Sequence, residues 1–253
     1  MLRTFAAGRL FGSRSGEGEP TVLALHGWAR THRDFDAVLR PLGAPELAAI
    51  AVDLPGFGMT SPPVEPWGSA DYAHCVSAVL GEMAGPAVVV AHSFGGRVAL
   101  HLAASRPDAV RALVLTGVPL LRATPPRRPR LAYRAVRSRH RAGLVGEERM
   151  ERARRRYGSA DYAAATGVMR QVHGRVVVES YEAQLDALDC PVTLVWGDDD
   201  ATAPLSIARA ALERLGRPPN GIAADLVVVT GVGHLLPLAA PGALRAAVER
   251  HLG

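Results

Sequence analysis

Short, uninterrupted apolar runs recur along the chain, and segments long enough to form helices separate most of them. Six runs have the length of β-strands: residues 22–25, 47–52, 87–90, 110–115, 192–195 and 226–229. Strands that are apolar throughout are typical of a parallel sheet buried on both faces, and their alternation with helices is the pattern of α/β proteins. We therefore expect an α/β fold with a mostly parallel central sheet and helices on both faces.

The segment that begins at Ser69 has the clearest helical period. Apolar residues recur there at the i, i+3, i+4, i+7 spacing that gives a helix one buried face; they are Tyr72, Cys75, Val76, Val79, Leu80 and Met83. Because serine is a preferred N-cap residue, the pattern predicts a helix capped by Ser69, with Cys75 in the core.

Composition adds few constraints to this picture. The chain has 253 residues, 48% of them hydrophobic, and a mean hydropathy of +0.09. A chain of this length can bury one sizeable core without disulfides or metals. Its two cysteines, Cys75 and Cys190, lie far apart in apolar surroundings, which favours a reducing compartment. The first ten residues lack a signal-peptide pattern, and no apolar stretch reaches about 18 residues, so we expect a soluble cytoplasmic protein.

The most informative motif follows the apolar run 87–90 and reads Ala-His-Ser-Phe-Gly-Gly from Ala91 to Gly96. A helical pattern begins immediately afterwards, so the motif is predicted to be a sharp turn between a strand and a helix. Such a turn exposes the hydroxyl of Ser93 above the strand ends, and it needs small residues two positions before and after the serine. Ser93 is therefore the candidate nucleophile.

Candidate partners for Ser93 follow two later strands. Asp198, Asp199 and Asp200 come after the run 192–195, and His234 lies in a glycine-rich loop after the last run. The carboxyl ends of parallel strands meet at one edge of a sheet, so these loops should converge. A neutral imidazole can take the serine proton while a carboxylate fixes its tautomer, which makes His234 the candidate base. Spacing alone does not choose among the three aspartates.

Acyl transfer also needs backbone N–H groups aimed at the developing oxyanion. The start of the helix after Ser93 offers the N–H of Phe94. The loop after the first long strand, His26-Gly27-Trp28, is expected to turn back over the nucleophile and to offer the N–H of Trp28.

Together these segments resemble the α/β-hydrolase family. The resemblance covers residues from about 20 to the end and rests on five motifs in that family's chain order: His26-Gly27-Trp28, Asp53-Leu54-Pro55-Gly56-Phe57-Gly58, Ala91 to Gly96, Trp196-Gly197-Asp198-Asp199-Asp200 and Gly233-His234. It implies that Asp200 is the triad acid and agrees with Trp28 and Phe94 as oxyanion donors. One departure is Ala91, which stands where the family usually has glycine. The serine argues against the epoxide hydrolases and haloalkane dehalogenases of this fold, which use aspartate.

The resemblance also implies a helical cap inserted into the core. We expect residues 1–118 and 190–253 to form the core and residues 119–189 the cap. From Arg122 to Arg156 the sequence has 13 arginines against three glutamates, a net charge of 13 minus 3, or +10. A positive cap would attract anionic ligands such as acyl carrier protein, coenzyme A or a carboxylated small molecule.

A competing interpretation of this charge is compositional, since all 29 basic residues are arginine and alanine, glycine and proline abound. The arginines would then be solvated helix faces. Without interleaved aromatic residues or a recognisable module, nucleic-acid binding is not expected. Pro125, Pro126 and Pro129 predict an irregular connection into the cap, and a helix is suggested around Glu147 to Tyr157.

Three functions fit these residues. The first is a serine hydrolase of a carboxylic ester or thioester, similar to the small esterases that cleave pimeloyl carrier-protein methyl ester. The second is a lyase or carbon–carbon bond hydrolase using the same triad, since the string Ser93 to Arg97 is similar to the pyruvate-eliminating lyase of menaquinone biosynthesis. The third is a non-catalytic binding protein on the same fold.

The substrate-binding candidates are His26 and Arg97. Arg97 lies one helical turn beyond Ser93 and offers a bidentate site for a substrate carboxylate. We expect a small-molecule substrate, with anionic and carrier-bound ones as candidates. We expect no metal and no cofactor, because the triad needs neither, and no membrane partner, because no apolar stretch is long enough to span a membrane.

Overall fold

The computed structural model describes residues 2–40, 42, 47–121, 131–157, 159–217 and 221–253. Contacts divide the chain into two compact units. The first is drawn from residues 1–62, 67–122 and 180–253, and the second from 63–66 and 123–179. Residues 180–189, expected in the insertion, fall in the first unit. The prolines predicted to form an irregular connection, at positions 125, 126 and 129, lie outside the described residues.

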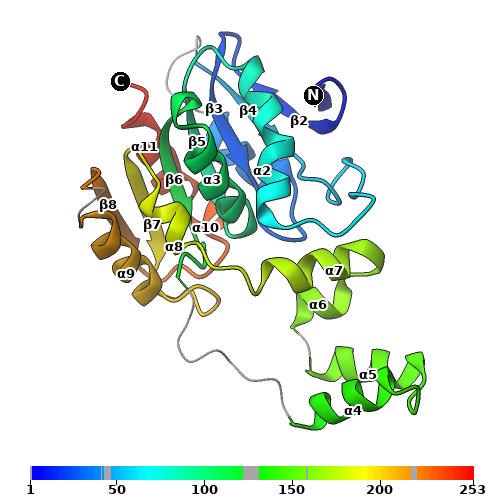
Figure 1. The fold of residues 1–253 in the computed structure, drawn as a ribbon. Coiled ribbons are helices and arrows are strands. Elements are labelled where there is room, and N and C mark those ends of the chain that lie inside the picture. Colours follow the sequence, from blue (N-terminus) through cyan, green and yellow to red (C-terminus); the bar gives the residue numbers. More distant parts are fainter. Residues whose placement is uncertain (1, 41, 43–46, 122–130, 158, 218–220) are drawn as a thin grey trace. The chain divides into compact units, whose positions relative to one another are not determined.

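An eight-stranded sheet forms the centre of the first unit (Figure 1), with the strand order β1-β2-β4-β3-β5-β6-β7-β8. The strands are β1 (Leu2–Phe5), β2 (Leu10–Ser15), β3 (Pro20–Leu25), β4 (Ala48–Val52), β5 (Ala87–His92), β6 (Val110–Thr116), β7 (Val192–Gly197) and β8 (Ala224–Val229). From β4 to β8 all neighbouring strands are parallel. The predicted α/β class is confirmed.

The apolar runs form strands because both faces of the sheet are covered. Successive side chains of a strand point to opposite faces. In β5, Val88 and Val90 join a core cluster that includes Phe35 and Leu244. The alternate residue Val89 is equally buried on the opposite face. Burial of every position leaves no polar alternation in the sequence, as expected for central parallel strands.

Two strands were not expected from the sequence. β1 and β2 pair antiparallel with each other, and β2 pairs antiparallel with β4 at the edge of the sheet. Their burial is partial: three of the four residues of β1 are exposed, and four of the six residues of β2 are half-buried. Because neither strand is buried throughout, neither has the uninterrupted apolar run that marks the parallel strands in the sequence.

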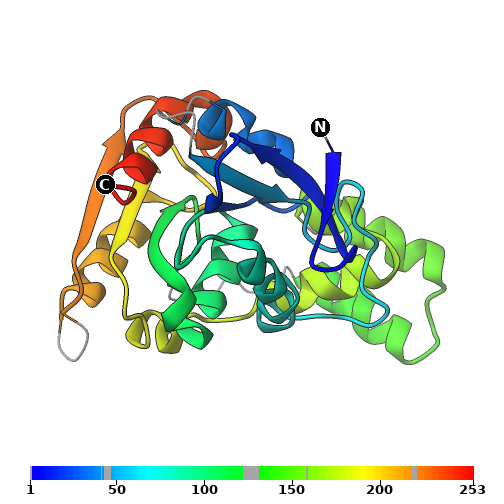
Figure 2. The same ribbon diagram turned by 90° about the horizontal axis from the view of Figure 1, so that it is seen from above.

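Helices pack on both faces of the sheet (Figures 1 and 2). On one face lie α2 (Ser69–Ser77), α3 (Phe94–Ser105), α8 (Glu182–Asp186) and α9 (Leu205–Leu215). On the other lie α1 (Asp36–Leu39), α10 (Leu236–Ala239), α11 (Pro241–Glu249) and the 3₁₀ turn His32–Phe35. Further 3₁₀ turns span Ala78–Glu82 and Pro107–Ala109.

The predicted cap of α2 is wrong by one residue. Gly68 is the N-cap residue, and its N–H donates to the Asp71 carboxylate (2.8 Å), while Ser69 is the first helical residue. The Ser69 hydroxyl instead lies 3.1 Å from the Tyr181 hydroxyl in the interior. The helical period of this segment also changes, because the α-helix gives way to a 3₁₀ turn at Ala78.

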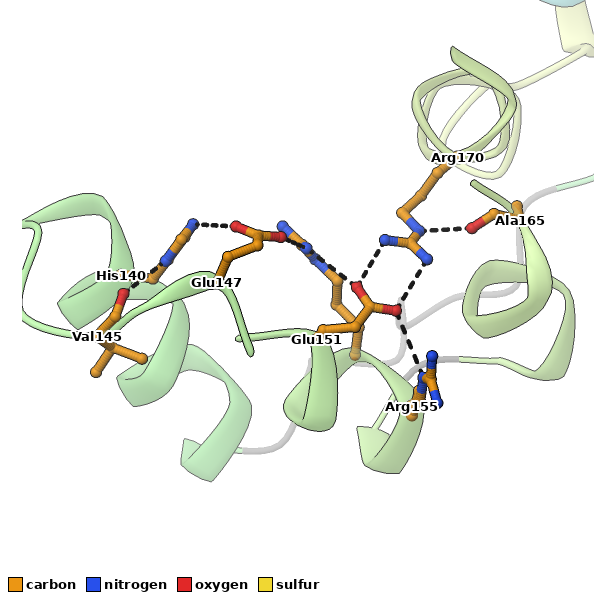
Figure 3. Close-up of polar contacts among 8 residues, drawn as sticks. His140, Val145, Glu147, Glu151, Arg155, Ala165 and Arg170 are labelled. Atoms are coloured by element: carbon orange, nitrogen blue, oxygen red, sulfur yellow. Dashed lines mark hydrogen bonds and ion pairs between the residues drawn. The ribbon is translucent and has the colours of Figure 1, made fainter. Parts of the chain in front are cut away.

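The second unit contains four helices in its described residues: α4 (Leu131–Arg141), α5 (Glu147–Tyr157), α6 (Ala160–Ala164) and α7 (Gly167–Val176). A group of polar contacts in this unit gathers around Glu151 of α5 (Figure 3). The Arg170 guanidinium of α7 donates two hydrogen bonds to that carboxylate, at 2.7 and 3.0 Å, and a third to the Ala165 carbonyl. Arg154 and Arg155 also pair with Glu151. Part of the arginine-rich sequence is therefore used in internal ion pairs.

Candidate active site

Ser93 occupies a strained turn between β5 and α3. Its φ and ψ are 48° and −107°, a left-handed conformation that costs free energy for a residue with a side chain. The turn lies so close to β3 that only glycine fits at position 95. A Cβ atom added to Gly95 would lie 2.2 Å from the Leu25 carbonyl oxygen. Ala91 is fully buried within β5 opposite Leu25 and Leu115, so its methyl group is part of the sheet packing.

The loops after β7 and β8 bring an imidazole and a carboxylate to Ser93. His234 Nε2 lies 3.1 Å from Ser93 Oγ, and His234 Nδ1 lies 2.8 Å from Asp200 Oδ2. In the sequence, His234 lies 141 positions after Ser93 and 34 positions after Asp200. The structure thus brings together the three residues that the sequence analysis singled out as a triad.

Asp200 differs from its two neighbours in burial and in hydrogen bonding. It is 4% exposed, whereas Asp198 and Asp199 are exposed. Its second oxygen, Oδ1, accepts hydrogen bonds from the N–H groups of Thr202 and Ala203 at 2.9 and 2.8 Å. Burial raises the pKa of this carboxyl group, but the hydrogen bonds from His234 and the two N–H groups outweigh that effect and hold the pKa below its usual value.

Asp198 contacts the loop after β8 instead. Its Oδ1 accepts a hydrogen bond from the Gly231 N–H at 2.7 Å. This contact and the bond from the Asp199 N–H to the Val232 carbonyl (3.1 Å) tie the loop after β7 to the loop that carries His234.

The predicted oxyanion donors lie on two segments beside Ser93. Phe94 is the first residue of α3, and the first N–H groups of a helix have no partner within it. Trp28 follows Gly27, where an added Cβ atom would lie 3.5 Å from Ser93 Cβ. Ala29, the next residue, has a φ of 54°, which marks a second strained turn.

The two predicted substrate-binding residues make contacts within the protein. His26 is fully buried; its Nε2 accepts a hydrogen bond from the Leu54 N–H (2.9 Å) and its Nδ1 donates to the Gly27 carbonyl (2.7 Å). Arg97 lies with its guanidinium carbon 5.7 Å from the ring centre of Tyr181. Its Nη1 is 3.5 Å from the Tyr181 hydroxyl.

The sequence did not single out the aromatic cluster beside Ser93. Phe57, from the loop after β4, packs edge-on against the rings of Trp28 (5.0 Å between centroids) and Phe94 (6.0 Å). Tyr72 of α2 packs against Phe94 at 5.0 Å. Trp28 and Phe57 are half-buried, so both rings leave part of their apolar surface exposed. Phe57 was visible in the sequence only as part of a glycine-containing loop motif.

Comparisons with known proteins agree with this fold. A model of the alpha/beta hydrolase family matches residues 22–247. The thioesterase domain from the curacin biosynthetic pathway superposes with a TM-score of 0.70 at 21% identity, over 98% of each chain.

Two curated relatives match over a shorter stretch. Lipase LipV of Mycobacterium tuberculosis is 44% identical over 99 residues, 39% of this chain and 37% of its own length. A pimeloyl-[acyl-carrier protein] methyl ester esterase of Neisseria meningitidis is 40% identical over 95 residues, 38% of this chain and 35% of its own length. The matches therefore span little more than a third of these relatives.

The chain belongs to the alpha/beta hydrolase family, since the family model covers most of its length. This confirms the family resemblance drawn from the five motifs. Within the described part of the chain, no helix combines the length and apolar character of a transmembrane span.

Proposed function

We propose that the protein is a serine hydrolase that cleaves a carboxylic ester or thioester through an acyl-enzyme. The observation that carries the proposal is the His234 imidazole, whose Nε2 lies 3.1 Å from Ser93 Oγ and whose Nδ1 lies 2.8 Å from Asp200. Both distances are within hydrogen-bond reach, which is the geometric requirement for a nucleophile, its base and the group that orients the base.

In the proposed reaction, Ser93 Oγ attacks the carbonyl carbon and His234 Nε2 takes its proton. The resulting imidazolium is stabilised by Asp200, which stays ionised because its pKa is held below its usual value. The same proton passes to the departing alcohol or thiol as the carbonyl re-forms. Water, activated by His234, then attacks the acyl-enzyme and releases the acid and free Ser93.

The negative oxygen of each tetrahedral intermediate is assigned to the N–H groups of Phe94 and Trp28. Donors fixed by a helix start and by a strained turn are oriented before the reaction, which is what makes such a site effective. In our account His26 supports the loop that carries Trp28, because its Nδ1 donates to the Gly27 carbonyl and its Nε2 accepts from the Leu54 N–H.

The aromatic cluster supports an apolar group on one side of the scissile bond. The half-buried rings of Trp28 and Phe57 lie in mutual contact and would cover such a group from water. The names of the relatives, a lipase and a carrier-protein methyl ester esterase, are compatible with this substrate class.

The lyase and carbon–carbon hydrolase alternatives depend on Arg97 as a carboxylate ligand. Its guanidinium is directed to Tyr181, so a carboxylate would have to compete with that contact. We therefore favour the ester hydrolase, and the cap role of residues 119–189 stays a prediction.

The test is hydrolysis of p-nitrophenyl esters with acyl chains from C2 to C12. We expect turnover that is lost in Ser93→Ala and kept in Ser105→Ala, a matched serine at the far end of α3. Turnover that survives in Ser93→Ala, or a wild-type protein inactive on every ester and thioester offered, would contradict the proposal.

A further inference from the structure

His92, the residue before Ser93, contacts the main chain of the proposed base. It is the last residue of β5 and is 1% exposed. Its Nε2 lies 2.9 Å from the backbone carbonyl oxygen of His234, 142 positions away in sequence. The two imidazole rings also pack together, with 4.9 Å between centroids and an angle of 52° between planes.

This contact fixes the tautomer of His92. A carbonyl oxygen can only accept, so Nε2 must carry the proton and donate it. In the neutral ring Nδ1 is then an acceptor. Among the described residues Nδ1 has no hydrogen-bond partner, and it faces Gly27, where an added Cβ atom would lie 2.7 Å away. A second proton on Nδ1 would therefore have no acceptor.

The surroundings keep His92 uncharged. Burial lowers its pKa to about 4, and the nearby His234 acts in the same direction. The bond to the His234 carbonyl and the charges of Asp34 and Asp200 oppose this shift but do not overcome it. A neutral ring matters here because a second imidazolium next to His234 would disfavour the protonated base on which the reaction depends.

The loop that carries His234 needs such an anchor. It contains Gly231 and Gly233, and the main-chain contacts with the β7 loop described above act at Gly231 and Val232. His92 ties the main chain of His234 itself to the strand that leads into Ser93. The nucleophile and its base are thereby held to a common element.

We propose that His92 is a positioning residue, whose Nε2–H holds the His234 main chain so that His234 Nε2 faces Ser93 Oγ. The proposal rests on the proposed function, because it takes His234 to be the base. It extends the site to a residue that never touches substrate.

The test compares His92→Gln with His92→Asn, two polar variants of similar chemistry. The longer glutamine side chain can bring its amide N–H close to the position of Nε2, whereas the asparagine amide reaches only the position of Nδ1. Positioning predicts that kcat falls about 10- to 100-fold in His92→Asn, with KM changed less than about twofold, and that His92→Gln recovers most of the loss. His74→Leu, which removes an exposed histidine on α2, is the control and should match wild type.

A merely structural role would lower kcat and raise KM together, or would affect the glutamine and asparagine variants equally; either result overturns the proposal. So does wild-type kcat in His92→Asn. Because all variants are compared on esters whose turnover requires Ser93, failure of this inference is distinct from failure of the proposed function, which would show first in the wild type.

A second readout does not depend on activity. Imidazole ¹⁵N NMR of the wild-type protein should find a proton on Nε2 of His92 and none on Nδ1 between about pH 5.5 and 8. A ring that titrates within this range, or that carries its proton on Nδ1, would refute the proposed hydrogen bond.

Discussion

Mild acid should destabilise this protein, because two fully buried histidines must remain neutral in the folded state. Burial lowers the pKa values of His26 and His92 from 6.5 to about 4. The unfolded chain therefore binds more protons than the folded one between these two values. Stability is complete above pH 6.5 and declines as the pH falls towards 4.

The magnitude follows from the size of the shifts. One pKa unit corresponds to 1.36 kcal/mol, so a histidine shifted from 6.5 to about 4 costs about 3 kcal/mol once the pH is below both values. The two together cost about 7 kcal/mol, against a typical total of 5–15 kcal/mol for a folded protein. Asp200 has an effect of the same sign, but at lower pH. Its pKa is lowered from 3.8, so its stabilisation is present above that value and is lost only at lower pH.

Urea unfolding at a series of pH values between 7 and 4.5 measures the effect. We expect the free energy of unfolding to fall most steeply near pH 5, where unfolding takes up nearly two protons and the slope is about 2 to 3 kcal/mol per pH unit. In His92→Gln one of these protons disappears and the slope should halve. A free energy that stays constant over this range, or an unchanged slope in the variant, would refute the assignment of buried, neutral histidines.

Three substitutions probe the site itself. Asp200→Asn should lower kcat about 10³- to 10⁴-fold, because the base loses its orienting charge, while Asp199→Asn should keep near wild-type ester hydrolysis; equal effects would contradict the choice of Asp200. Gly117→Ala should lower kcat and cost about 1–2 kcal/mol in unfolding experiments, because its φ is 60° and an added Cβ would lie 3.0 Å from the His234 ring. Phe57→Ala should lower kcat/KM for hexanoyl esters about 10-fold more than for acetyl esters, and an equal loss on both would argue against an apolar subsite.

The buried parallel strands and the turn at Ser93 were predictable from the sequence, because burial on both faces leaves uninterrupted apolar runs and the turn demands small neighbours. β1 and β2 were not, since their exposed and half-buried positions leave no such run. The choice of Asp200 needed the family resemblance, because only the folded chain separates one buried carboxylate from two exposed ones.

The contacts of His92 could not be predicted at all. Its motif is local, but its partner is a carbonyl oxygen 142 residues away in the sequence. Every residue has a main-chain carbonyl, so the sequence does not indicate which one accepts the hydrogen bond. The same holds for Arg97, whose spacing from Ser93 suggested a ligand while its neighbour in the fold is Tyr181.

The most direct test of the central claim is to treat the protein with a fluorophosphonate and to locate the adduct by peptide mass spectrometry. Our account predicts one covalent adduct, on Ser93, that forms rapidly in the wild type and is strongly slowed in His234→Ala. An adduct on another serine, or none under conditions in which the protein is folded, would contradict a nucleophilic Ser93.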